Sequence, residues 1–109
     1  AWTVHRVFRK KGSNAFLYAV AMGDLNGDGL DDIVFPDSES KKVRIFLQGA
    51  DDQFRELPEA QEPAINSQAQ CARLIDVNGD GRLDLVIAKT VPSSSPSDPG
   101  GWSVYLNRP

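Results

Sequence analysis

The sequence predicts an all-β fold built from two copies of one repeat. Short runs of β-branched and aromatic residues, such as 32–35 and 84–87, follow loops rich in glycine and aspartate. The pattern recurs 52 residues later, so that Asp24 aligns with Asp76. A single cysteine among 109 residues excludes a fold stabilised by internal disulfides. A metal ion or a partner chain is therefore the expected source of additional stability.

The charged residues exclude some functions and point to another. With 12 Lys+Arg against 15 Asp+Glu, the net charge of −3 argues against a nucleic-acid partner, because phosphate contacts require clustered positive charge. The longest apolar run, 16–22, is too short to cross a bilayer, so no membrane insertion is expected. Seven of the 15 acidic residues lie in two short loops, 23–32 and 75–84. Carboxylates so close together repel one another, which favours a bound cation.

Both loops carry the string D-x-N-x-D-G-x-x-D, which supplies oxygen ligands at positions 1, 3, 5, 7 and 9, with a backbone carbonyl at position 7. In the first loop the predicted ligands are Asp24, Asn26, Asp28, the carbonyl of Leu30, and Asp32. In the second loop they are Asp76, Asn78, Asp80, the carbonyl of Arg82, and Asp84. We therefore expect two Ca²⁺ ions per chain, since Mg²⁺ demands a tighter octahedral shell.

The residues around these ligands separate the loops from other calcium motifs. Gly29 and Gly81 at position 6 allow the sharp turn around the ion. An EF-hand loop needs a carboxylate at position 12, where this sequence has Phe35 and Ile87. The flanking runs are typical of strands, so each loop is expected to join two strands.

The sequence resembles the tandem FG-GAP or VCBS repeats of β-propellers. The resemblance rests on the two loops, on the strand pairs that follow them and on the stretch 101–107. Such repeats occur in integrin α-chain heads and in some lectins, and the resemblance covers nearly the whole chain. It implies that each repeat forms a four-stranded antiparallel blade, in which the calcium loop connects the first and second strands.

The resemblance implies that the whole chain, 1–109, is a single unit of two blades. Blade one is expected over 15–60, with strands at 17–22, 32–35, 42–48 and 53–57. Blade two is expected over 65–109, with strands at 68–75, 84–88 and 102–107. The segment 91–101 between the last two strands is rich in proline, serine and glycine, which indicates a surface loop.

Blade two lacks a fourth strand, and the N-terminal segment 1–10 offers one. Residues 2–8 alternate as a strand does and precede the first strand of blade one, which gives the phasing 4-1-2-3-4-1-2-3. Closed propellers have four to eight blades, so two blades need neighbours. We expect copies of the chain to complete the ring, three for six blades or four for eight. An excised piece of a longer propeller is the alternative.

A few other residues invite functional interpretation. Trp2, Trp102 and Tyr105 could stack on sugar rings, but Trp102 and Tyr105 align with Val43 and Phe46, which favours packing for both and leaves Trp2 as the candidate ligand residue. Cys71 aligns with Ala19, so we expect it to serve as a small, buried residue of the first strand of blade two.

The function expected from the resemblance is that of a non-enzymatic, calcium-binding module outside the cell, similar to a lectin or an adhesin, that binds a glycan or protein ligand. Two alternatives are a structural or engineered repeat pair whose only ligand is Ca²⁺, and a piece of an extracellular carbohydrate-active enzyme. No catalytic residues are assigned.

Overall fold

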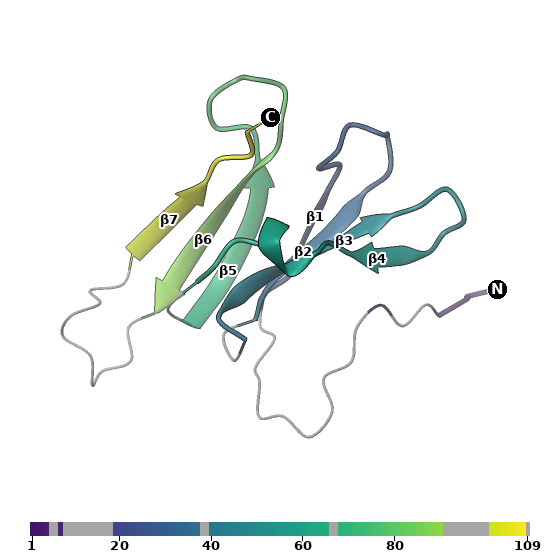
Figure 1. Ribbon diagram of the computed structural model, residues 1–109, viewed down its shortest axis with the longest axis horizontal. Helices are drawn as coiled ribbons and strands as arrows, with labels where there is room; N and C mark the ends of the chain where they lie inside the picture. The colour runs from purple at the N-terminus through teal and green to yellow at the C-terminus, as the bar shows by residue number, and fades with distance from the viewer. Residues whose placement is uncertain (5–6, 8–18, 38–39, 66–67, 91–100, 109) are drawn as a thin grey trace.

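A computed structural model describes residues 1–4, 7, 19–37, 40–65, 68–90 and 101–108, which form two antiparallel sheets (Figure 1). The first sheet has the order β1 (Ala21–Gly23), β2 (Asp32–Asp37), β3 (Lys42–Gln48) and β4 (Phe54–Glu56). The second has the order β5 (Gln68–Ile75), β6 (Asp84–Thr90) and β7 (Gly101–Tyr105). Each sheet is an up-and-down meander of neighbouring strands, as a blade requires, so the all-β prediction is confirmed.

The strand bounds differ from the predicted ones at a few ends. The prediction for β3 and β5 is confirmed residue for residue, whereas β1 begins later than position 17 and β7 ends at Tyr105. The prediction that β2 stops at Phe35 is wrong, because the strand continues through Pro36 to Asp37. Pro36 lies opposite Val43, whose N–H donates to the carbonyl of Pro63. This pair therefore needs no N–H from the proline, which is why the strand tolerates it.

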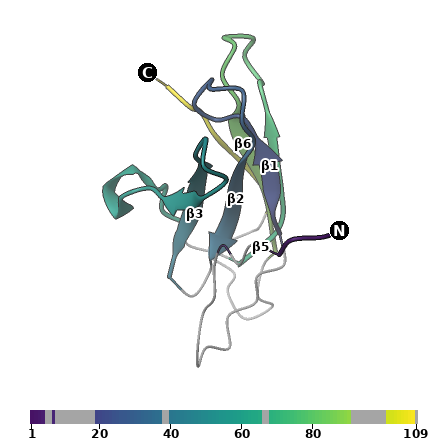
Figure 2. The ribbon, with the colours of Figure 1, turned by 90° about the vertical axis from the view of Figure 1, so that its right-hand side faces the viewer.

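The two sheets share one hydrophobic core. They meet along β5, which lies against β1 and β2, and spread apart toward β4 and β7 (Figures 1 and 2). The first sheet contributes Val34 and Val43, exposed by 1% and 0%, and the second contributes Leu85 and Ile87. Where the sheets spread, they enclose a groove of about 600 Å³.

The link between the sheets is held against β3 by charged residues. After a 3-10 turn, η1 (Glu59–Gln61), Glu62 accepts the N–H of Ile45 at 2.9 Å, and its other carboxylate oxygen lies 3.0 Å from Nζ of Lys42. The neighbouring Glu56 contacts Arg44 at 2.9 Å. Burial and the nearby Glu62 carboxylate raise the pKa of Glu56, against the opposing effect of Arg44.

Each sheet also has an outer face that no other described strand covers. On the second sheet this face presents Cys71, Ile75, Trp102, Val104 and Leu106, with Trp102 exposed by 74%. The predictions that Cys71 is buried and that Trp102 packs are thus wrong for the single chain. Their counterparts Ala19 and Val43 are buried because the second sheet covers them, whereas the face that carries Cys71 and Trp102 has no such neighbour.

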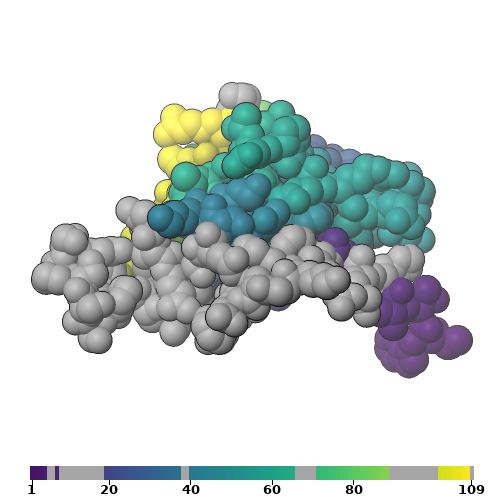
Figure 3. Space-filling view, turned by 60° about the horizontal axis from the view of Figure 1, so that its bottom comes forward, coloured from purple at the N-terminus to yellow at the C-terminus, as the bar shows by residue number. Residues whose placement is uncertain are grey.

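The N-terminal segment lies far from β7. Residues 1–4 (purple) lie at the lower right in Figure 3, well separated from the C-terminal segment with β7 (yellow) at the upper left. The described residues 1–4 and 7 belong to no strand, and Trp2 is 99% exposed. Positions 5, 6 and 8 of the predicted closing strand lie outside the described residues, so that strand stays a prediction.

None of the helical segments in the described part of the chain is long and apolar enough to span a membrane.

The shared core gives a first prediction. Ile87→Ala, at a side chain exposed by 1%, should lower the free energy of unfolding by about 2–5 kcal/mol, because it removes buried methylene groups and leaves a cavity between the sheets. Urea unfolding at fixed calcium measures this loss. Val77→Ala, at a side chain 46% exposed, serves as control and should change the free energy of unfolding by less than about 0.5 kcal/mol. Equal losses in the two variants would contradict a core shared by the sheets.

Candidate metal centres

The two acidic loops lie at the same end of the sheets, between β1 and β2 and between β5 and β6 (Figures 1 and 2). Their backbones follow the same path. Gly29 and Gly81 have φ values of 84° and 86°, in the left-handed region that favours glycine. The sharp turn predicted at the glycine of position 6 is therefore present in both loops.

Each loop brings its three aspartates together. Asp24, Asp28 and Asp32 each offer one carboxylate oxygen within 4.8 Å of the others, and so do Asp76, Asp80 and Asp84. Two unit charges at this separation repel by about 1 kcal/mol in bulk water, and by more where the field is less screened. Each of the two loops thus holds three carboxylates close together, and a bound cation would stabilise this arrangement.

The carboxylate at position 1 organises the turn. Asp24 accepts the N–H groups of Gly27 and Gly29 at 2.8 Å and of Asp28 at 3.2 Å. Asp76 repeats this with Gly79 and Gly81. The hydrogen bond from Gly29 is the largest cause that lowers the pKa of Asp24 below its ordinary value of 3.8, and Gly81 does the same for Asp76. Both groups therefore favour the folded loop above pH about 4, and that effect is lost as the pH falls through their lowered pKa values.

The carboxylate at position 9 joins the loop to the sheet. Asp32, at 0% exposure, accepts the N–H of Leu25 at 2.8 Å and that of Gln48, at the end of β3, at 2.9 Å. Asp84, at 1% exposure, accepts the N–H of Val77 at 3.0 Å and that of Asn107 at 2.8 Å. Gln48 and Asn107 are 59 positions apart, so the same contact recurs at the offset that the aligned third strands predict.

The remaining predicted ligands lie in the same loops. Asn26 and Asn78 are exposed, and Oδ1 of Asn78 accepts the N–H of Asp80 at 3.3 Å. The six aspartates are brought together as expected. The roles of these two amides, and of the carbonyls of Leu30 and Arg82, as ligands stay predictions.

The donor set fits a calcium ion. Calcium ligands lie 2.3–2.6 Å from the ion, so oxygens on opposite sides of one shell are about 5 Å apart, and the carboxylate oxygens of each loop are within that limit. Asp28 and Asp80 each accept a loop N–H through one oxygen, from Leu30 and Arg82, and their side chains are open to solvent. Hard, anionic oxygen donors without sulfur or imidazole favour calcium over transition metals.

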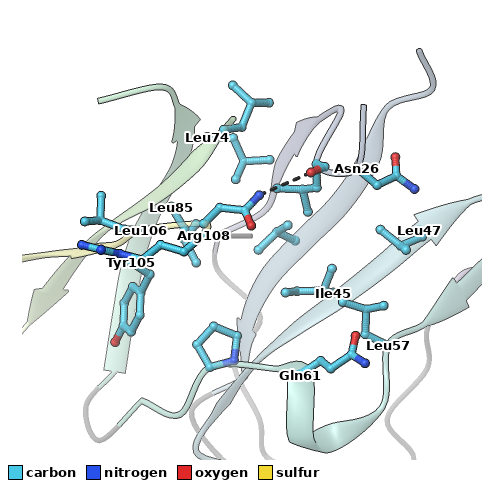
Figure 4. A pocket seen from close by; sticks show the side chains of 15 residues that line it. Asn26, Ile45, Leu47, Leu57, Gln61, Leu74, Leu85, Tyr105, Leu106 and Arg108 are labelled. Atoms are coloured by element: carbon cyan, nitrogen blue, oxygen red, sulfur yellow. Dashed lines mark hydrogen bonds between the residues drawn. The ribbon is translucent and has the colours of Figure 1, made fainter. Parts of the chain in front are cut away.

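Sequence reasoning missed the connection between the two loops. The side-chain amide of Asn107 donates to the carbonyl of Leu25 in the first loop at 3.3 Å, across the groove between the sheets (dashed line in Figure 4). Leu74, Leu85 and Tyr105 line one side of this groove, and Ile45, Leu47 and Leu57 line the other. The one available signal was that amide side chains, Gln48 and Asn107, stand at matching positions of the two repeats.

Fold and loops together define a class: repeat proteins of small antiparallel sheets, each with an acidic loop between its first two strands. A family model of the FG-GAP-like repeat matches residues 24–87, more than half of the chain. The chain belongs to this family, as its resemblance predicted. Searches of curated proteins and of solved structures each found no match.

Proposed function

We propose that the chain is a non-enzymatic, calcium-binding pair of β-propeller blades that works outside the cell. The observation that carries this proposal is the recurrence of one carboxylate triad, with one hydrogen-bond pattern, in both repeats. Open loops of this type suit the calcium concentrations found outside cells, where modules bind at about 10⁻⁴–10⁻³ M.

Bound calcium would stabilise the folded chain. Asp24, Asp28 and Asp32 would hold one ion, and the aspartates of the second loop would hold the other. The ion supplies positive charge that cancels the repulsion within each triad. Binding to the folded chain alone stabilises it by about 2.7 kcal/mol for each site when the free calcium concentration is a hundred times the Kd.

Calorimetric titration tests the two sites separately. The wild-type chain should bind two Ca²⁺ ions, whereas Asp28→Asn and Asp80→Asn should each bind one, because each variant loses one anionic ligand but keeps an oxygen of similar shape. Chelator should lower the Tm of the wild-type chain.

Asp31→Asn is the matched control, since Asp31 is exposed and lies in the first loop outside the triad. It should retain both ions. Wild-type protein that binds no calcium, with a Tm that chelator leaves unchanged, would disprove the proposed function.

We further propose that the module assembles with copies of itself into a closed ring. The support is the internal repeat. The outer face of the second sheet aligns with the face of the first sheet that is buried between them: Val104 with Ile45 and Leu106 with Leu47. The outer face of the first sheet presents Val20 and Met22, exposed by 63% and 57%, which align with the packed residues Ala72 and Leu74.

The occupant of these two faces is therefore a second copy, placed as the two sheets of one chain are placed. The same neighbour would bring its N-terminal segment to the outer edge of β7, which pairs with no other described strand than β6. In the first sheet, β4 fills the corresponding position beside β3. Head-to-tail contacts of this kind form rings when the rotation closes.

A mixing experiment tests the assembly. Val104→Arg on one face and Met22→Arg on the other should each give monomers by light scattering, because every head-to-tail contact needs both faces. Mixed together, the two variants should form a 1:1 dimer, since each retains the face that the other lacks. Glu59→Arg, at an exposed position of η1, is the control and should assemble like wild type. A calcium-loaded wild-type chain that stays monomeric would rule out the ring.

Glycan recognition is a second candidate function, favoured by the groove between the sheets. Its volume suits a small ligand, and its lining is mostly apolar but includes the amide side chains of Asn26, Gln61 and Asn107. Trp2, the aromatic candidate from the sequence, is exposed on the N-terminal segment at the side of the molecule away from β7.

A glycan array with calcium-loaded protein tests this function. We expect bound glycans whose signals fall at least fivefold in Gln61→Ala, which removes a hydrogen-bonding group from the groove. The same fall in Trp2→Ala, with Gln61→Ala unchanged, would move the site to the N-terminal segment. An array without signal would leave calcium, or a protein, as the ligand.

A further inference from the structure

Two contacts connect the first acidic loop with the second. One is polar: the side-chain amide of Asn107 donates to the carbonyl of Leu25 at 3.3 Å. The other is steric: a Cβ added at Gly23 would lie 2.6 Å from Cδ1 of Leu83. Gly23 immediately precedes Asp24, and Leu83 immediately precedes Asp84, so both contacts involve residues next to predicted ligands. The polar contact runs through Asn107, which lies after β7 and also contacts Asp84, whereas the steric contact joins the two loops directly.

The polar contact is one of three hydrogen bonds that, together with the covalent structure of Asn107 and Leu25, link the two carboxylates at position 9. The backbone N–H of Asn107 donates to Asp84 at 2.8 Å, and its side chain donates to the carbonyl of Leu25. The N–H of Leu25 in turn donates to Asp32 at 2.8 Å. One residue, Asn107, thus contacts a carboxylate of the second triad and the backbone between positions 1 and 3 of the first.

We propose that Asn107 couples the two calcium sites, so that an ion in the second loop raises the affinity of the first. This inference rests on the proposed function, because it presupposes calcium in both loops. An ion held by Asp84 would fix the position of that carboxylate and, through it, the backbone of Asn107. The Asn107 amide then holds Leu25, and with it the spacing of the ligands on either side, in the geometry that the first ion needs.

The sign and size of the effect follow from the contacts. Ordering one loop reduces the entropy that the other must lose on binding, so the coupling is positive. It must also be reciprocal, because each ion changes the affinity of the other by the same factor. One hydrogen bond to a backbone carbonyl corresponds to roughly a three- to tenfold change in affinity.

Asn107 acts as a positioning residue in this proposal, and a double-mutant cycle measures its effect. Calorimetry gives the affinity of the first loop with the second loop intact and with the second loop disabled by Asp80→Asn. In the wild-type background, Asp80→Asn should lower the affinity of the first loop roughly three- to tenfold. In the Asn107→Ala background the same change should lower it less than about twofold.

Two further variants separate coupling from simple loss of structure. Asn107→Leu keeps the side-chain size and the backbone N–H to Asp84 but has no amide donor, so it should abolish coupling like alanine does. Arg108→Ala changes the exposed neighbour and should keep it. In chelator, hydrogen exchange at the Leu25 amide should be faster in Asn107→Leu than in the wild type.

The outcomes distinguish this inference from the function on which it rests. Coupling that survives in both Asn107 variants, or a wild-type first loop whose affinity Asp80→Asn leaves unchanged, overturns the role of Asn107 while calcium binding stands. Wild-type protein that binds no calcium overturns both. The cycle is measured at two protein concentrations, and a coupling that grows with concentration would assign it to contacts between copies instead of to Asn107.

Discussion

The interaction on which the rest of this structure depends is the buried carboxylate at position 9 of each acidic loop. Asp32 and Asp84 are exposed by 0% and 1%, and burying a charge is costly unless polar groups surround it. Each accepts one N–H from its own loop and one from a second residue, Gln48 at the end of β3 or Asn107 just after β7. A single side chain thereby fixes where the loop ends, where the second strand begins and how far away the third strand lies.

The arrangement of the two sheets turns these loops into a pair. Because the sheets meet along β5 and spread apart toward their outer strands, the loops come together at one end of the molecule (Figure 1). Gly23 permits the close approach of Leu83, and Asn107 reaches the backbone of Leu25. The position of the two acidic loops relative to each other is consequently set by two sheets that pack on one core.

Much of this could be read from the residues, since local patterns specify it. The nine-residue spacing places the aspartates, the glycines at position 6 permit the turn, and short runs of β-branched residues mark β2 and β6. Predictions failed where the answer depended on a neighbour. Pro36 is accommodated in β2 because Val43 turns its N–H toward Pro63, and Cys71 is exposed because no second sheet lies over its face. Sequence alignment equates Cys71 with Ala19, but it carries no information on which copy of the repeat is covered.

The sequence by itself determined the all-β class, the repeat, and six aspartates in two triads, because each of these follows from residue types at short, fixed spacing. Only the tertiary structure decided which face of each sheet is buried, which strand ends hold the position-9 carboxylates, and that Asn107 touches both loops. The physical reason is distance along the chain. Asn107 and Leu25 are separated by 82 positions, and their hydrogen bond exists because two sheets pack around one core.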